Sequence, residues 1–230
     1  MSDITESESG ASIAEEEILQ FRIWLKDVSP MIWRRVQVPV NMTLRELHGV
    51  FLVAMGWENI HLFQFGLRAS RFGSWELSAK SPDVTLDELQ LRKGIRFRYE
   101  YDLNIPWEHE VRLEARLSPD PRRNYPYCTA GSGNCPPEDC GGPFAFMSQT
   151  DSAFDYEAYE DLAEAAEMVN ELVFQGNFEI VKDKQQVEEI KALVDRLNGR
   201  VSMLGIPFER KSVNGRFRQG DHLMLMHQQL

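Results

Sequence analysis

A capped amphipathic helix near residue 50 constrains the fold of this 230-residue chain more than any other feature of its sequence. Thr43 and Glu46 form the pattern of a capping box, with Thr43 as the N-cap and Glu46 at the third helical position. Gly56 stands where a C-terminal glycine ends a helix. Between them, side chains follow at helical spacing, namely Leu44, Leu47, His48, Phe51 and Met55. Such a helix buries one face, and we expect that face to lie on a sheet.

Strand-like segments on both sides of this helix supply the sheet. They are residues 18–25, 31–38, 61–67, 75–77, 95–102 and 109–117. The first two are joined by a short link and predict a hairpin, and the last two alternate apolar and polar side chains and predict another. We therefore predict an α+β fold: a mixed or largely antiparallel sheet with a helix packed on one face, in a β-grasp-like ββα start, plus C-terminal helices.

The rest of the chain divides by composition. We expect a long loop at residues 118–143, an acidic helix at 154–174, and a further helix from about 187 to 199. The predicted organisation is given by four segments: an acidic disordered leader (1–17), an α+β core (18–147), a helical extension (148–199) and a basic tail (200–230).

The formal charge of −11 is unevenly distributed along the chain. Residues 1–17 hold six acidic residues and residues 151–171 hold eight, and neither stretch contains Lys or Arg. Outside them, 22 acidic residues face 25 basic ones. A charge of −11 taken alone argues against a nucleic-acid partner, but this distribution leaves such a partner open.

Three cysteines lie close together between Cys128 and Cys140, and an odd number does not resemble a secreted disulfide framework. The polar, acidic start lacks the pattern of a secretory signal, and no run approaches the ~18 apolar residues of a spanning helix. We expect a cytoplasmic protein with no membrane partner.

Asp102 and His109 stand on either side of the link between two predicted strands. A tight hairpin there would bring a carboxylate and an imidazole together, an arrangement suited to proton transfer or metal binding. The simpler interpretation, favoured on sequence alone, is that Asp102 caps the turn and His109 packs beside Trp107.

Cys128, Cys135 and Cys140 follow a C-x6-C-x4-C pattern and could bind zinc if His109 (or His61 or His48) completed the site. This spacing is not the C-x2-C of most zinc ribbons. The prolines and glycines around it suit a rigid loop equally well, and buried reduced cysteines are common without metal. Zinc is thus one alternative for this segment.

Trp33 precedes two adjacent arginines, Arg34 and Arg35, which a strand points to opposite faces. One of them can reach a phosphate or an acidic partner, although a surface pair is the simpler interpretation. Arg216 and Arg218 in the basic tail could extend a nucleic-acid contact, with a solvated charged tail as the alternative. The sequence contains no P-loop, dinucleotide-binding glycine motif, G-x-S-x-G elbow or H-E-x-x-H motif.

Five separated motifs together resemble the plasmid pRiA4b Orf-3-like family over about residues 19–147. These motifs are Pro30-x-x-Trp33-Arg34-Arg35, Thr43-Leu44-x-x-Leu47-His48, Gly56-Trp57 with His61-Leu62, Tyr101-Asp102 with Trp107-x-His109, and the segment at 136–142 (PPEDCGG), the most specific of them. The resemblance implies an α+β fold and an association with plasmids or mobile elements, in a family that is largely uncharacterised. The family usually reads Tyr-Asp-Phe-Gly-Asp before Trp-x-His, whereas Ile105 here replaces the second carboxylate.

Our leading hypothesis is a binding or interaction module for a protein or a small ligand, without an assigned reaction. Motifs that cluster around turns suggest a shared pocket. Its expected residues are Trp33, His48, Trp57, His61, Asp102, Trp107, His109 and Cys140. The alternatives are a metal-assisted hydrolase or nuclease-like enzyme and a nucleic-acid-binding accessory protein. The enzyme would use His61, Asp102, His109, Glu138 and the cysteines.

Overall fold

The computed structural model describes residues 17–74 and 78–227. Its centre is a seven-stranded sheet in the order β4-β3-β5-β6-β1-β2-β7, in which every neighbouring pair is antiparallel. The strands are β1 (Ile18–Leu25), β2 (Trp33–Pro39), β3 (Phe63–Leu67), β4 (Ser70–Gly73), β5 (Arg96–Tyr101), β6 (Trp107–Leu117) and β7 (Tyr127–Ser132). The helices are α1 (Leu44–Met55), α2 (Gly142–Ser152), α3 (Tyr156–Val169), the π-helix η2 (Asn170–Phe174), α4 (Lys184–Met203), α5 (Arg210–Gln219) and α6 (Asp221–Leu225). The predicted α+β class is confirmed.

The chain begins with the predicted ββα unit. β1 and β2 pair in the register that places Ile18 opposite Pro39 and Trp24 opposite Trp33. α1 then begins at the expected capping box, in which Thr43 and Glu46 each bond the other's backbone, and it ends at Gly56 in the left-handed conformation. The second predicted hairpin forms β5 and β6. The predicted strand at 75–77 lies outside the described residues.

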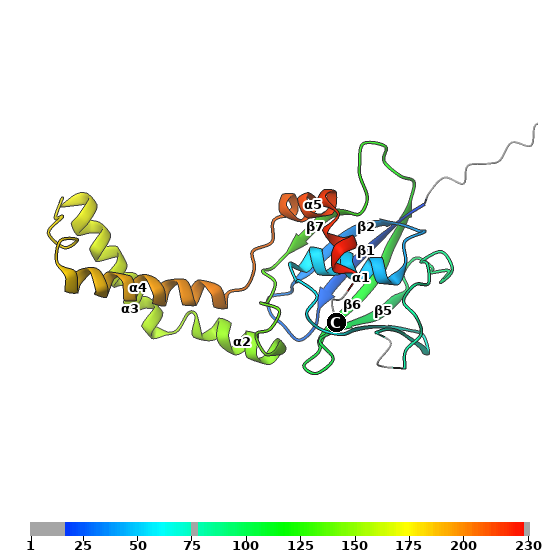
Figure 1. Cartoon of the computed structure of the whole chain (residues 1–230), viewed down its shortest axis with the longest axis horizontal. Coiled ribbons are helices and arrows are strands. Elements are labelled where there is room, and N and C mark those ends of the chain that lie inside the picture. The colour runs from blue at the N-terminus through cyan, green and yellow to red at the C-terminus, as the bar shows by residue number, and fades with distance from the viewer. Residues whose placement is uncertain (1–16, 75–77, 228–230) are drawn as a thin grey trace, which may run out of the picture.

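The sheet has two unlike faces because side chains alternate along each strand. One face, here the helix face, lies under α1 and carries the core, with Phe21, Phe65 and Tyr99 fully buried. The other, here the open face, carries polar positions of the same strands, which are half-buried or exposed except for the buried Gln37 and Glu100. The helices α1, α5 and α6 lie together on one side of the strands (Figure 1).

The segment expected to be one long loop contains an edge strand. β7 (Tyr127–Ser132) pairs with β2, and Asn214 of α5 donates to the carbonyl of Cys128 and accepts from its N–H. Its sequence of small and polar residues, YCTAGS, gives no alternating pattern. The periodicity of side chains therefore does not predict this strand, and its contacts with β2 and Asn214 hold it in place.

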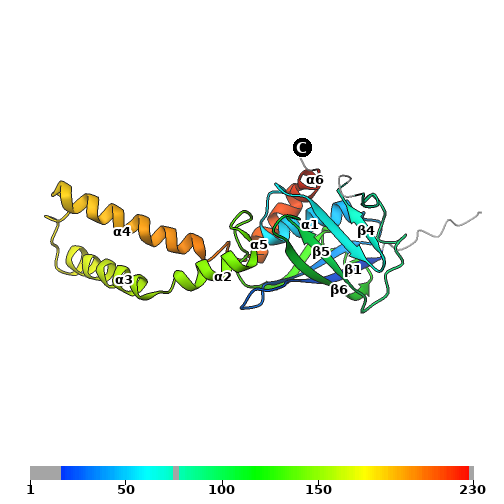
Figure 2. The same ribbon diagram turned by 90° about the horizontal axis from the view of Figure 1, so that it is seen from below.

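A helical hairpin extends away from the sheet (Figure 2). We call residues 155–204, which hold α3, η2 and α4, the arm. α3 begins at Asp155, whose side chain accepts from the backbone N–H of Ala158, and α4 begins at Asp183 in the same way. The two predicted helices of the extension are thus present, and α4 continues to Met203. No described helix is long and apolar enough to cross a membrane.

After the arm the chain returns to the sheet, and the basic tail is not a solvated extension. α5 packs against β7 and α6 against α1. Gly49 makes the second contact possible: a Cβ atom there would stand 2.0 Å from the carbonyl oxygen of His222. The tail has weak periodicity because its apolar residues meet two different elements.

Candidate functional site

Six of the eight residues predicted to share a pocket pack together at one end of the helix face. They are His48, Trp57, His61, Asp102, Trp107 and His109. Trp57 is their centre: its ring lies 5.2 Å from that of Tyr101, 5.8 Å from that of Trp107 and 5.5 Å from that of His109. Trp57, Tyr101 and Trp107 are at most 1% exposed, so their rings form a closed aromatic core.

His48 is a neutral member of this core. Its Nδ1 lies 2.7 Å from the Tyr99 hydroxyl, its Nε2 lies 3.0 Å from Oδ1 of Asn59, and its ring stacks on Phe63 at 3.7 Å. Complete burial lowers the pKa of His48 to about 3. The imidazole therefore acts as a hydrogen-bond bridge between α1 and the sheet.

His109 is also neutral and buried. Its Nδ1 lies 2.9 Å from the carbonyl of Trp107, and burial lowers its pKa to about 3. Its Nε2 has no hydrogen-bond partner among the described residues. Since β5 and β6 pair Tyr99 with His109, the ring points into the core beneath the sheet.

Asp102 faces His61 instead of the His109 that the sequence suggested. Oδ1 of Asp102 lies 3.8 Å from Nδ1 of His61 and accepts the backbone N–H of Asn104 at 3.1 Å. Asp102 has a φ of 58°, so it turns the chain after β5, as the simpler interpretation expected. On the far side of His61, Nε2 lies 4.0 Å from Oδ1 of the exposed Asp139.

Glu138 closes this end of the core. From the sequence it was predicted only among the residues of the enzyme alternative and not in the expected pocket. It accepts the hydroxyl of Tyr101, the backbone N–H of Glu58 at 2.7 Å and that of Ile60 at 3.2 Å. The indole N–H of Trp107 donates to its carbonyl at 3.2 Å. The Pro-Pro-Glu-Asp segment, part of the motif most specific to the family, therefore covers the aromatic core as a lid and is joined to it by hydrogen bonds.

The cysteines do not form a metal centre with the residues described. No group of three or more His, Cys, Asp or Glu side chains there is arranged to hold a metal ion. Cys128 and Cys135 are buried, and burial raises their thiol pKa to about 11 and about 12. Cys140 is half-buried beside α2. The zinc and metalloenzyme alternatives thus find no ligand set in the described chain.

The prediction that Trp33 lines the shared pocket is wrong, because Trp33 lies on the open face with Trp24 beside it. Arg22 lies over both rings, with its guanidinium carbon 5.9 Å from the Trp24 ring and 4.8 Å from the Trp33 ring. Arg35 and Arg96 approach the same two rings from either side, at 5.4 and 5.9 Å. Strand alternation sends Trp33 away from His48, so the two never share a cavity.

Beside this pair, four arginines form a row across four adjacent strands. Arg96 of β5 stands opposite Arg112 of β6, Arg112 opposite Arg22 of β1, and Arg22 opposite Arg35 of β2. At about 4.8 Å between strands, the row is about 14 Å long. Like charges directly opposite each other destabilise a sheet. The arrangement therefore has a cost that packing does not explain.

The two outer arginines of the row are neutralised and the two inner ones are not. Arg35 binds Glu114 at 2.6 Å and Arg96 binds Glu110 at 2.8 Å. Arg22 and Arg112 form no ion pair with a described residue, and the buried Nε of Arg22 has no hydrogen-bond partner there. The centre of the open face thus carries two arginines without an ion pair of their own, and Glu114, the partner of Arg35, is the carboxylate that interacts with Arg22 at longer range.

Arg34 takes the opposite position from Arg35 and is buried. Its guanidinium donates to the carbonyls of Ala54, Trp33, Ser132 and Gly133, and it stacks on Phe208 at 4.3 Å. It ties α1 to β2 and β7, and it is unavailable for the nucleic-acid contact predicted for it.

The two tail arginines lie on α5, which packs on the same side of the sheet as α1. Arg216 binds Asp221 at 2.7 Å and Glu58 at 3.2 Å, while Arg218 is exposed. The structure therefore separates Arg216 and Arg218 from Arg35, and the predicted contact residues do not form one surface.

The fold and its surfaces define an antiparallel α+β module with one helix-covered face, one open face and a projecting helical arm. The model of the family described as "Plasmid pRiA4b ORF-3-like protein" matches residues 17–183, and the chain belongs to this family. It is 32% identical over 156 residues to the uncharacterised protein y4hQ of Sinorhizobium fredii, a match covering 65% of this chain and 79% of the relative. A crystal structure of the protein of unknown function MM3350 from Methanosarcina mazei Go1 is similar with a TM-score of 0.52 and 33% identity, over 64% of this chain and 87% of that one.

Proposed function

We propose that this protein is a binding module that holds single-stranded nucleic acid on the open face of its sheet. The observation that carries the proposal is the arginine row with its unpaired centre, Arg22 and Arg112, beside the tryptophan pair. Single-strand binders without strict sequence preference combine a basic surface for phosphates with aromatic rings for base stacking.

The charge on the open face supports phosphate binding. The carboxylates Glu100, Glu108, Glu110 and Glu114 each pair with a neighbouring basic side chain, and none of them forms an ion pair with Arg22 or Arg112. A phosphate at this position would supply the counter-charge that the sheet lacks. A guanidinium also forms two parallel hydrogen bonds to a phosphate, which a lysine cannot do.

The tryptophan pair supports stacking of bases. Trp24 and Trp33 stand directly opposite each other on β1 and β2, and both are half-buried, which leaves part of each ring accessible. A sheet surface that offers aromatic rings to splayed bases is the mode by which single-stranded RNA is recognised on other sheets. Duplex DNA keeps its bases stacked inside and would gain only the phosphate contacts.

The test is fluorescence anisotropy of the full chain with 5′-labelled oligo-dT and oligo-U of 20 nucleotides, with a 20-base-pair duplex for comparison. We expect binding at 50 mM salt that weakens steeply with salt, and tighter binding to the single strands. In the double variant R22Q/R112Q the affinity should fall at least about tenfold and the salt slope by about 1.4, since each phosphate contact contributes about 0.7.

A matched control carries the same change in charge away from the open face. The double variant R92Q/R218Q replaces two exposed arginines, in the turn before β5 and on α5. It should bind nearly as the native protein does. Equal losses in both variants, or no binding of either single strand at 50 mM salt, would overturn the proposal.

A further inference from the structure

The arm presents a row of apolar side chains that no part of the described chain covers. On α3 the row consists of Tyr159, Leu162, Ala166 and Val169, spaced alternately by three and four residues. On α4 it continues with Val194 and Val201, seven residues apart. The five large members, Ala166 excluded, are between 47 and 71% exposed. We call these six residues the stripe.

Helix geometry places both halves of the stripe on the same side of the arm. α3 meets α4 through Ala158, Asp161, Leu193 and Arg200, which are buried or paired with each other. Every stripe residue on α3 and on α4 follows by one position a residue of this seam, or the residue seven positions further along the same helix. One residue turns a helix by about 100°, and in antiparallel helices that turn carries both rows to one side.

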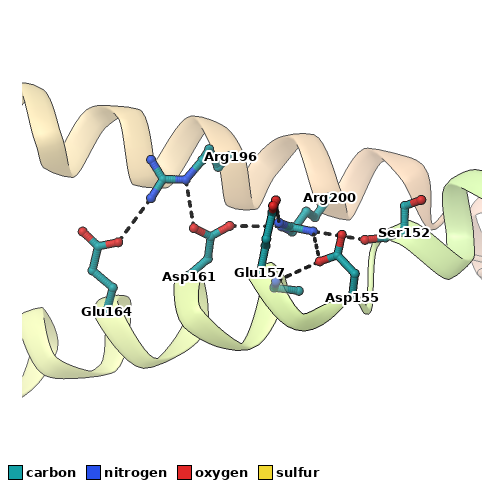
Figure 3. A network of polar contacts seen from close by, with 8 residues as sticks. Ser152, Asp155, Glu157, Asp161, Glu164, Arg196 and Arg200 are labelled. Atoms are coloured by element: carbon teal, nitrogen blue, oxygen red, sulfur yellow. Dashed lines mark hydrogen bonds and ion pairs between the residues drawn. The ribbon is translucent and has the colours of Figure 1, made fainter.

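A polar network holds the two helices in this arrangement (Figure 3). Asp161 accepts from Arg196 at 2.8 Å and from Arg200 at 3.1 Å, and Arg200 also binds Asp155 at 2.9 Å. Arg196 reaches Glu164 as well, at 3.2 Å. Both arginines of the arm are thereby paired within the network, and neither forms an ion pair with Glu160 or Glu167.

The arm is also strongly acidic in composition. Residues 155–204 hold 12 acidic and five basic residues, a net charge of −7, whereas residues 17–154 and 205–230 hold 19 acidic and 20 basic ones. Glu160 and Glu167 follow stripe residues directly, at its outer edge, and neither forms an ion pair with a described residue. The stripe is therefore bordered by free negative charge.

We propose that the stripe binds an amphipathic helix of another protein whose apolar face is flanked by Lys or Arg. An apolar row at three- and four-residue spacing fits the apolar face of a third helix, and free carboxylates at its edge select basic flanks. A second copy of this arm would bring another charge of −7 against the first, so Coulomb repulsion opposes self-association.

The experiment uses the full chain and three fluorescent 18-residue peptides in 50 mM salt. The first has Leu at alternating three- and four-residue spacing and Lys elsewhere. The second has Glu in place of Lys, and the third has the first peptide's composition in an order without helical periodicity. We expect only the first to bind. The variant L162S/V169S, which keeps the net charge, should lose at least about tenfold in affinity.

A second pair of variants separates charge at the stripe from charge in general. E160Q/E167Q should weaken binding about threefold at 50 mM salt and have no effect at 500 mM, because exposed charges are screened there. E179Q/E189Q, the same change elsewhere on the arm, should have little effect. Circular dichroism should show unchanged helix content in all variants.

Three results would overturn the proposal. They are equal binding of the Lys and Glu peptides, equal binding of the ordered and unordered Lys peptides, and native binding by L162S/V169S. Sedimentation of the protein alone is the fourth check. A dimer that L162S/V169S converts to a monomer would assign the stripe to a second copy of the chain instead.

Discussion

Arg22 lies directly opposite Arg112 across β1 and β6, and neither guanidinium has a carboxylate partner among the described residues. Opposed like charges on a sheet cost about 0.2 to 1 kcal/mol relative to neutral pairs. Chains carry such costs where a ligand supplies the missing charge. Stability and binding should therefore change in opposite directions when one of these arginines is replaced.

The variant R112Q should be more stable than the native protein by about 0.5 kcal/mol, because the repulsion with Arg22 disappears while the strand keeps a polar, exposed side chain. Its affinity for single-stranded oligonucleotides should fall. Urea unfolding measures the first effect and anisotropy the second, with R92Q as the control for each. A loss of stability in R112Q would show that Arg112 supports the sheet instead.

Stability should fall steeply as the pH drops below about 6.5. His48 and His109 have folded-state pKa values of about 3 against 6.5 when unfolded. Between pH 3 and 6.5 the unfolded state therefore binds more protons, so folding is favoured less as the pH falls. Each histidine contributes about 1.4 kcal/mol per pH unit in this window and nothing above it.

Urea titrations at pH 7.5, 6 and 5 measure this slope. In H48Q, where a side-chain amide can still bond Asn59 or Tyr99, the slope should be smaller by about 1.4 kcal/mol per pH unit. An unchanged slope in a folded H48Q protein would contradict the neutral state assigned to His48.

Replacing Glu138 by alanine should destabilise the fold by about 3 kcal/mol. The change removes the acceptor for Tyr101 and for two backbone N–H groups, and the buried hydroxyl, which still accepts the backbone N–H of His61, is left with no acceptor for its own proton. D139A, at the exposed neighbouring carboxylate, is the matched control and should unfold like the native protein. Similar unfolding midpoints for the two variants would show that the lid is not anchored by Glu138.

One thiol of three should react with iodoacetamide in the native protein at pH 8. Burial raises the pKa of all three thiols, but Cys128 and Cys135 are buried whereas Cys140 is half-buried and reachable. Mass spectrometry should find one adduct, none in C140S, and three in guanidinium. A native count of zero that rises on adding a chelator would revive the zinc alternative.

Local patterns predicted the front half of the fold well. The capping box at Thr43, the helix it starts and the two hairpins all follow from rules that act within a dozen residues. Six residues that were predicted to share a pocket pack together for a related reason, since their motifs lie at the turns that bring the strands together, although they form a closed core. β7 could not be found in this way, because α5 holds it from 86 residues further along the chain.

The errors concern faces of the sheet. Alternation indicates that Arg34 and Arg35 point apart, but it does not say which face the helix will cover. That choice is made by α1, whose Ala54 carbonyl receives Arg34. The same choice exposes Trp33 and creates the arginine row, because the row exists only through the register of four strands. Pairing of His61 with Asp102 likewise depends on a loop whose path the sequence does not reveal.

Among the described residues, the charge of −7 on the arm against a nearly neutral remainder (residues 17–154 and 205–230) acts as a permanent electric dipole. Near a polyanion the field of the polymer exerts a torque on this dipole, which turns the sheet-bearing end toward the polymer and the arm away from it, over distances longer than any contact. The two surfaces then point into different surroundings. The nucleic-acid strand and the basic helix of the two proposals would then bind at the same time without meeting.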